Sequence, residues 1–261
     1  MNTKHLKHTG WGFVSIAAGC ALLWLISPGG SPSLASAPDV EMVLVKGGCF
    51  QMGDSFGDGF DDEEPVHEVC IGDFYIGKYE VTQAEWQAVM GHNPSKFKGD
   101  RRPVESVSWE EAQAFIARLN QLTGKNYRFP TEAEWEYAAR SGGKKEKWAG
   151  TSDPGRLGEY AWYSANSGKT THEVGTRKPN GLGICDMGGN VWEWVDDYYE
   201  MTWYEKSAKD NPQGPPAGSH RILRGGSFGN PARGVRVTER GRSEPTSRDI
   251  AIGLRLATSS K

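Results

Sequence analysis

The chain has 261 residues, of which 37% are hydrophobic and 24% are charged, so it is long enough to bury the core of a full domain. Its formal net charge of -3 excludes a basic surface spread over the whole chain, so we expect no nucleic-acid partner, and any basic patch must be local. The 34 glycines, 14 prolines and 10 tryptophans favour a turn-rich fold packed around aromatic side chains over a helical bundle.

The first 37 residues have the pattern of an export signal. Lys4 and Lys7 precede an apolar run at 11–27, and a stretch of small residues then ends at Ala37, which together with Ala35 fits an A-x-A cleavage site. The apolar run also reaches the short limit for a membrane span, so an uncleaved N-terminal anchor, and with it a membrane contact, is the alternative. In both cases we expect residues 38–261 to form a single exported domain, periplasmic or otherwise extracytoplasmic.

Residues 41–52 and 66–79 are expected to be strands, because they are rich in Val, Ile, Phe and Tyr and are punctuated by glycine. Cys49 lies in the first segment and Cys70 in the second, so the two can face each other across a strand pair. Since export favours oxidised thiols, we predict a Cys49–Cys70 disulfide. Cys185 is then unpaired, and its apolar surroundings indicate a buried, inert thiol.

Three helices are predicted by capping boxes, in which two side chains satisfy each other's free backbone N–H groups. The pairs are Thr82 with Glu85, Ser108 with Glu111, and Thr131 with Glu134. These helices are expected to end at Gly91, Gly124 and Gly142. Between the two strand segments, the acidic loop at 53–65 is expected to be a solvated connection, with a cation site as the alternative. After Gly142 the periodicity ends, which predicts loops and short strands on an aromatic core.

Several motifs in a fixed order resemble the formylglycine-generating enzyme (sulfatase-modifying factor) family. They include VKGGCFQMG (45–53), YRFPTEAEWEYAAR (127–140), GLGICDMGGNVWEWVDD (181–197), RILRGGSF (221–228) and IGLRLA (252–257). The resemblance covers roughly residues 40–258. It implies an α+β, C-type-lectin-like fold with little regular secondary structure, in which short helices surround a small twisted sheet.

Oxidases of this family carry two cysteines just after the GGS motif, where they bind copper and oxidise a cysteine of the client sulfatase. In this chain those cysteines would fall near Asn230 and near Gly234 or Val235, and no cysteine follows Cys185. Copper(I) requires soft thiolate ligands, which an amide and an aliphatic side chain do not replace. We therefore expect no copper, and the sequence leaves open whether the chain is an enzyme.

The family also has a structural calcium ion at the DMGGNVWEW motif. The match carries over to the Asp186 side chain, the carbonyls of Gly189 and Val191, and the Glu193 carboxylate. Oxygen ligands of this mixture suit calcium. In the alternative interpretation, the two acidic side chains only cap turns while Trp192 and Trp194 pack in the core.

Arginines are concentrated in the last part of the chain, although the chain as a whole is mildly acidic. They are Arg221, Arg224, Arg233, Arg236, Arg240, Arg242, Arg248 and Arg255. Their guanidinium groups can hold an anion or a peptide carboxylate, or they can form internal ion pairs with Asp196, Asp197, Glu239 and Asp249. The predicted ligand groove is lined by Arg224, Ser227, Phe228, Asn230, Arg233, Arg236 and Arg242, with Trp192 and Trp194 below it.

Three functions remain open from the sequence. The first is an exported, non-oxidising family member that binds an anionic ligand or a protein partner in this groove, as an accessory maturation domain. The second is an oxidoreductase that matures a secreted protein or small molecule by a chemistry without cysteine. The third is a structural subunit of a periplasmic complex.

Overall fold

The computed structural model describes residues 37–260, all of which belong to one compact unit. The predicted export segment therefore lies outside the described residues, apart from its last position. Within 37–260, no helix has both the length and the apolar character needed to cross a lipid bilayer.

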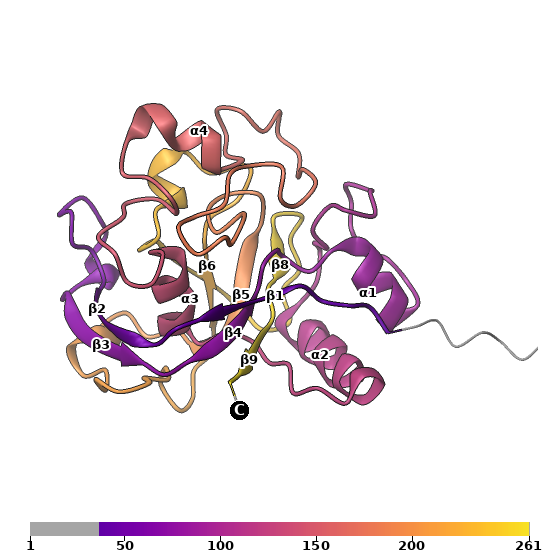
Figure 1. The fold of residues 1–261 in the computed structure, drawn as a ribbon, viewed down its shortest axis with the longest axis horizontal. Coiled ribbons are helices and arrows are strands. Elements are labelled where there is room, and N and C mark those ends of the chain that lie inside the picture. The colour runs from indigo at the N-terminus through magenta and orange to yellow at the C-terminus, as the bar shows by residue number, and fades with distance from the viewer. Residues whose placement is uncertain (1–36, 261) are drawn as a thin grey trace, which may run out of the picture. The chain divides into compact units, whose positions relative to one another are not determined.

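The two predicted strand segments each break into two strands, which together form a long two-stranded ribbon (Figure 1). The strands are β1 (Met42–Val45), β2 (Gly48–Met52), β3 (His67–Ile71) and β4 (Phe74–Gly77). β1 pairs with β4, and β2 pairs with β3, both antiparallel. The C-terminal strand β9 (Ala257–Ser259) adds to the other edge of β4. The first sheet is thus completed by the last strand of the chain.

The ribbon breaks at Gly47, where two strand segments approach closely. A Cβ atom on this glycine would lie 2.3 Å from the carbonyl oxygen of Ile71, so no larger residue fits. The Gly47 N–H instead donates to the Asp73 carboxylate at 2.9 Å. A side chain therefore replaces a ladder hydrogen bond at the break, which the strand-forming composition of both segments did not reveal.

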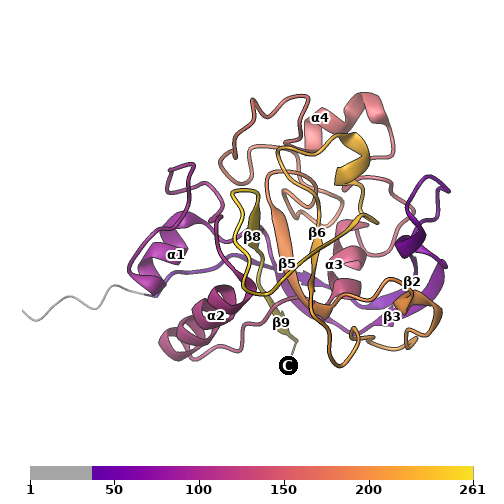
Figure 2. The same ribbon diagram turned by 180° about the vertical axis from the view of Figure 1, so that it is seen from behind.

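A four-stranded sheet forms the other main layer, seen from behind in Figure 2. Its strands are β5 (Trp192–Tyr198), β6 (Arg221–Arg224), β7 (Arg240–Ser243) and β8 (Ile252–Leu254), in the order β7-β6-β5-β8. β5 and β8 are parallel, and the other pairs are antiparallel. The described residues thus contain three small sheets, where one small sheet was expected.

The three predicted capping boxes are all present, at the start of α1 (Gln83–Met90), α2 (Trp109–Thr123) and α3 (Glu132–Ala139). Gly91 and Gly124 end α1 and α2 in the left-handed conformation, with φ of 80° and 67°. α3 ends before the predicted Gly142, because Ser141 already takes a left-handed φ of 52°. The remaining helical turns are α4 (Leu157–Tyr160) and the 3-10 turns η1 (Asp61–Glu63), η2 (Pro154–Arg156), η3 (Trp203–Glu205) and η4 (Ala232–Val235).

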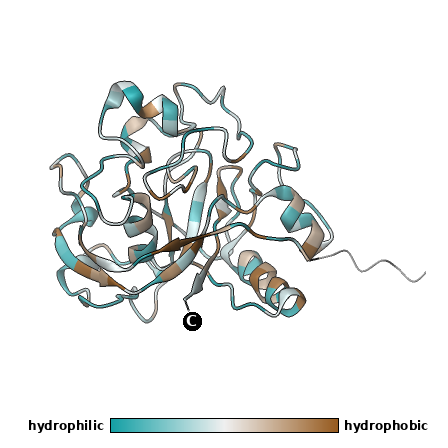
Figure 3. Ribbon diagram, viewed as in Figure 1, coloured by the Kyte–Doolittle hydropathy of each residue, from teal (hydrophilic) through white to brown (hydrophobic). Residues whose placement is uncertain are grey.

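Tryptophans organise the hydrophobic core. Trp135 on α3 lies in a cluster between the β2–β3 ribbon and the four-stranded sheet. Trp86 and Trp194 lie in a second cluster under α1 and α2, where Trp86 stacks on Phe115 with ring centroids 5.0 Å apart. Apolar and polar residues alternate around α2 in Figure 3, as an amphipathic helix requires. Trp194 therefore supports α2, and not a groove at the arginine-rich segment.

The predicted disulfide is confirmed. Cys49 and Cys70 are directly opposite each other on β2 and β3 and are bonded. Cys185 is free and buried, and burial raises the pKa of its thiol to about 11. An un-ionised thiol is a poor nucleophile and metal ligand, which agrees with the inert role expected for it.

Replacing both Cys49 and Cys70 by serine is expected to lower the free energy of unfolding by about 3 kcal/mol, because the bridge closes a loop and restricts the unfolded chain. Urea unfolding of the double variant measures this loss. A reducing agent should produce a similar loss in the unchanged protein and none in the variant, which still contains Cys185. Equal unfolding midpoints for the two oxidised proteins would contradict the expectation.

Candidate functional site

Two glutamates one turn apart on α3 hold a buried set of arginines. Glu136 accepts from Arg224 at 2.6 Å and from Arg140 at 2.9 Å. Glu132 accepts from Arg240 at 2.8 Å, and Tyr204 also donates to it at 3.2 Å. We call Glu132, Glu136, Arg140, Arg224 and Arg240 the α3 ion-pair network. Because all five are buried, their charges are neutralised mainly by one another.

The acidic loop is anchored in the same way and is not the solvated connection that was expected. Glu63 is fully buried and accepts from both terminal nitrogens of Arg236, at 2.6 and 2.7 Å. Arg236 also pairs with Glu239 at 3.0 Å. Nearby, Asp62 accepts from the Tyr199 hydroxyl at 2.9 Å.

These contacts correct the predicted groove. Arg224 and Arg236 were expected to line it, whereas the structure places both in the interior with carboxylate partners. Internal pairing was the alternative interpretation, but of the acidic residues named for it only Glu239 is an arginine partner here. The other carboxylate partners lie far away in the sequence, on α3, η1, α2 and β5.

The GGS segment forms a tight, buried turn. Asn230 accepts from the Ser227 hydroxyl at 2.7 Å and from its N–H at 3.0 Å. A Cβ atom on Gly226 would lie 2.0 Å from the Gly234 carbonyl oxygen, and its φ is 70°, so glycine is required. Phe228 is buried and meets Phe97 edge to face, with centroids 5.5 Å apart. Ser227 was expected to line the groove, but it is buried and its hydroxyl tightens this turn.

Arg233 and Arg242 are the two residues of the predicted groove that open onto one surface pocket. The pocket has a volume of about 500 Å³ and is lined by Gly59, Phe60, Asp61, Asp62, Tyr199, Met201, Arg233, Arg240 and Arg242. We call it the arginine–aromatic pocket. Arg233 lies over the Phe60 ring at 3.8 Å, and Arg242 donates to the Tyr199 hydroxyl at 2.9 Å. Within residues 37–260 neither guanidinium has a carboxylate in ion-pair range.

Sequence reasoning missed the aromatic side of this pocket. Phe60 belongs to the acidic loop, which was considered only for metal binding or solvation, and Tyr199 and Met201 follow β5 without any motif. Phe60 lies beside Arg233 because the neighbouring Gly59 carbonyl accepts a hydrogen bond from that arginine at 3.0 Å. Tyr199 meets the same loop through its hydroxyl, which donates to Asp62. No local pattern predicts such a contact between distant segments.

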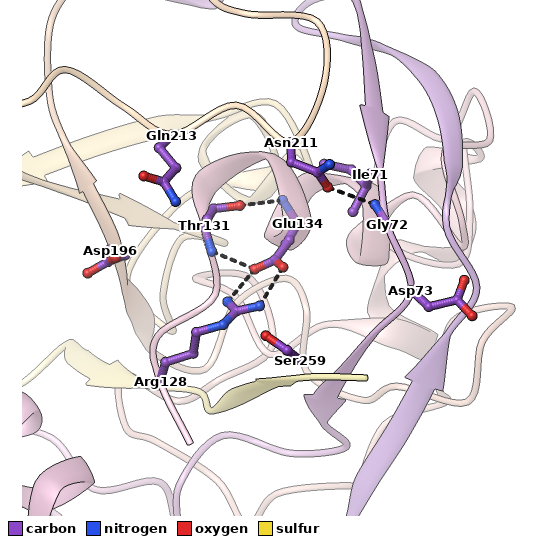
Figure 4. Close-up of a pocket in the computed structure, with 10 residues that line it drawn as sticks. All are labelled: Ile71, Gly72, Asp73, Arg128, Thr131, Glu134, Asp196, Asn211, Gln213 and Ser259. Atoms are coloured by element: carbon purple, nitrogen blue, oxygen red, sulfur yellow. Dashed lines mark hydrogen bonds and ion pairs between the residues drawn. The ribbon is translucent and has the colours of Figure 1, made fainter. Parts of the chain in front are cut away.

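A second pocket, of about 280 Å³, is polar and is drawn in Figure 4. Arg128 and Glu134 form a two-bond ion pair at its base, at 2.6 and 2.7 Å. On its rim, Asn211 accepts from the Gly72 N–H at 2.8 Å. The central charges thus neutralise each other, so the arginine–aromatic pocket, whose two exposed arginines lack carboxylates, is the better candidate for a functional site.

The residues expected to bind calcium enclose an excess of negative charge. Glu193 accepts from Arg255 and from the Trp135 indole N–H, each at 2.6 Å. Asp186 accepts from the Gly175 N–H through one oxygen, while its other oxygen, Oδ1, is buried without a partner among the described residues. Burial raises the pKa of Asp186 to about 6, and burial with the nearby carboxylates raises that of Glu80 well above its ordinary value.

A cation fits the Asp186 side of this arrangement, because an unpaired buried carboxylate oxygen is costly. No three or more His, Cys, Asp or Glu side chains in residues 37–260 are grouped to hold a metal. Calcium would therefore need main-chain oxygens, as the assignment of the Gly189 and Val191 carbonyls assumes, and it would share Glu193 with Arg255. Calcium binding here stays a prediction.

Calcium is expected to raise the melting temperature relative to protein in EGTA, because it would neutralise buried carboxylates of the folded state only. At free calcium of a hundred times Kd the gain is about 2.7 kcal/mol. Asp186→Ala should lose this response, whereas Asp58→Ala, which removes an exposed carboxylate elsewhere, should keep it. Identical melting curves with calcium and with EGTA would remove the case for a calcium site.

Asp197 was expected to pair with an arginine. Instead, it is buried at the start of α3, where its carboxylate accepts a hydrogen bond from the Glu132 N–H at 2.7 Å. Burial raises the pKa of Asp197 to about 7, and the Glu132 charge raises it further than the N–H contact lowers it. The folded state therefore holds a proton that the unfolded chain releases near pH 4.

Because the folded-state pKa is the higher one, Asp197 favours folding fully below about pH 4 and loses this contribution as the pH rises through about 7. Asp197→Asn should remove the dependence, so the stability of the variant relative to the unchanged protein should rise by up to about 4 kcal/mol between pH 4 and pH 8. Denaturant unfolding across this range measures the difference. A difference that does not vary with pH would mean that Asp197 is ionised throughout.

Comparison with known proteins agrees with the architecture. The chain is 32% identical to the chaperone protein LppX of Paenibacillus barcinonensis, over 84% of this chain and 89% of that protein. It is 31% identical to the formylglycine-generating enzyme of Streptomyces coelicolor, over 82% of this chain and 88% of the enzyme. Among solved structures, Treponema denticola variable protein 1 superposes with a TM-score of 0.79 at 34% identity, covering 84% of this chain and 95% of that one.

The α+β fold class predicted from the sequence motifs is thereby confirmed. The model of the sulfatase-modifying factor enzyme 1-like domain matches residues 31–260, which is most of the chain. The chain belongs to the sulfatase-modifying factor family.

Proposed function

We propose that this chain is an exported, non-oxidising member of its family that acts as a binding or accessory maturation domain through the arginine–aromatic pocket. The observation that carries this proposal is the pair of exposed guanidinium groups, Arg233 and Arg242, that share one pocket without carboxylate partners in the described residues. The other arginines of this region that form ion pairs are held by glutamates. Arg221 also lacks a carboxylate partner among the described residues, but its guanidinium is half-buried and stacks on Trp109 and Tyr198.

The chemistry of the pocket supports an anion with an apolar part. A guanidinium offers a planar set of donors that matches a carboxylate, sulfate or phosphate. Among the described residues, Arg233 donates from its side chain to the Gly59 carbonyl and Arg242 to the Tyr199 hydroxyl, and each has further donor groups without a partner there. Phe60 and Met201 add exposed apolar surface beside these charges.

The cysteines support a non-oxidising role. Cys49 and Cys70 are joined in a disulfide, and the thiol of Cys185 is buried with a raised pKa. The family resemblance places the copper-binding cysteines near Asn230 and near Gly234 or Val235, and none of these residues is a cysteine. The similarity to a protein named as a chaperone is in keeping with an accessory role.

The proposal is tested by the double variant Arg233→Gln/Arg242→Gln. Titration with acetate, citrate and phosphate, followed by NMR of the arginine Nε–H groups, should move the Arg233 and Arg242 signals in the unchanged protein. In the double variant, binding of all three anions should fall by at least about tenfold, because both charge-assisted donors are gone. Arg248→Gln, which removes an arginine already paired with Glu111, should leave binding unchanged.

Two outcomes would overturn the proposal. One is anion binding that the double variant retains in full, because the pocket would then not be the site. The other is uptake of oxygen when copper-treated protein is mixed with a cysteine-containing peptide, with aldehyde formed in the peptide. That result would favour the oxidoreductase alternative.

A further inference from the structure

The loop that forms one wall of the arginine–aromatic pocket is held rigidly although it exposes two phenylalanines. Asp54 accepts from the Phe56 N–H at 3.0 Å and from the Gly59 N–H at 2.6 Å. Glu63, anchored by Arg236, accepts from the Phe60 N–H at 3.1 Å. These bonds fix the backbone on both sides of each aromatic residue, so the exposure of the rings is a property of the ordered loop.

Cationic side chains from two other segments flank this loop. On one side, the Lys145 and Lys147 ammonium groups lie 5.1 and 5.9 Å from the centre of the Phe56 ring. On the other side, the Arg233 guanidinium lies 3.8 Å from the centre of the Phe60 ring. Lys147 pairs with Asp58 at the tip of the loop, whereas Lys145 has no ion-pair partner among residues 37–260.

The apolar groups between these charges are large and solvent-exposed. The exposed fractions are 36% for Phe56, 45% for Phe60 and 53% for Met201. We call the set Phe56, Phe60, Lys145, Lys147, Met201, Arg233 and Arg242 the cation–aromatic surface. Exposed aromatic and methionine side chains with arginine are typical of protein contact surfaces.

Building on the proposed function, we propose that the occupant of this surface is an acidic polypeptide segment that also carries an apolar side chain. A small anion would satisfy Arg233 and Arg242 but would leave Phe56 and Lys145 uncovered. A polypeptide spans from the pocket to the far side of the loop, and its carboxylates complement Lys145, Arg233 and Arg242, which have no ion-pair partner among the described residues.

An anionic membrane surface is the rival that shares this chemistry. It is disfavoured because the surface includes a concave pocket, which a flat bilayer does not fill, and because Asp61 lies in that pocket. Its carboxylate would face lipid headgroups of the same charge. A peptide can place its acidic residues beside the cations and avoid Asp61.

The test uses the full chain and a fluorescein-labelled peptide with several Asp and Glu residues around one Phe, followed by fluorescence anisotropy. Two matched peptides replace either the acidic residues by Asn and Gln or the Phe by Ala. We expect the acidic peptide with Phe to bind at least about tenfold more tightly than either matched peptide, and binding to weaken as salt is raised.

Variants on the far side of the loop separate this inference from the proposed function. Phe56→Ala and Lys145→Gln should each weaken binding of the peptide several-fold. Binding of acetate and citrate should stay unchanged, because neither residue lines the pocket. Leu122→Ala, an exposed apolar residue on α2, and Arg248→Gln are the matched controls and should change nothing.

Three outcomes would overturn the inference. Small anions binding as tightly as the acidic peptide would confine the site to the pocket and leave the proposed function intact. If the Arg233→Gln/Arg242→Gln variant still bound both the peptide and the anions in full, this inference and the proposed function would both be contradicted. Stronger binding to phosphatidylserine vesicles than to the peptide, with the same sensitivity to Phe56→Ala, would assign the surface to a membrane.

Discussion

The buried ion pairs between α3 and the C-terminal arginines are the interaction on which the rest of this structure depends. Glu136 accepts from Arg224 of β6 and from the Gly53 N–H in the loop after β2, and Glu132 accepts from Arg240 of β7. Removing one member of such a set leaves an uncompensated buried charge, which typically costs about 3 to 5 kcal/mol. Because guanidinium and carboxylate groups require specific geometry, the network fixes how the helix, the sheet and the loop meet.

Buried ion pairs also determine which of the arginines in this region remain exposed to solvent. Arg224 and Arg240 face α3 and are neutralised there, and Arg236 is neutralised by η1. Arg233 and Arg242 lie in the same stretch of sequence but are exposed, over Phe60 and Tyr199. Structural and available arginines are therefore interleaved in a short stretch, and only their neighbours distinguish them.

Features encoded locally were predictable from the sequence. A capping box requires two side chains three positions apart, so Thr82, Ser108 and Thr131 marked the starts of three helices correctly. The Cys49–Cys70 bridge followed from two adjacent strand-like segments and an expected oxidising compartment. The order of motifs gave the fold class.

Features that depend on contacts between distant residues were not predictable. The partner of Arg236 is 173 positions away at Glu63, and that of Arg224 is 88 away at Glu136. The break of the ribbon at Gly47 depends on the carbonyl of Ile71 in another strand. A single sequence offers no pattern for such pairs. The predicted groove therefore included Arg224 and Arg236, which are buried in the interior.

β9 and Arg255 join the C-terminal part of the described chain to its earlier segments. The sheet that begins with β1 is closed by the last strand, and the Glu193 carboxylate is neutralised by Arg255, a few residues from the end. Without these two contacts, β4 would have an open edge and Glu193 would be a buried acid without its arginine. Both contacts join segments that are far apart in the sequence, and such non-local contacts slow folding because a long loop must close before they form.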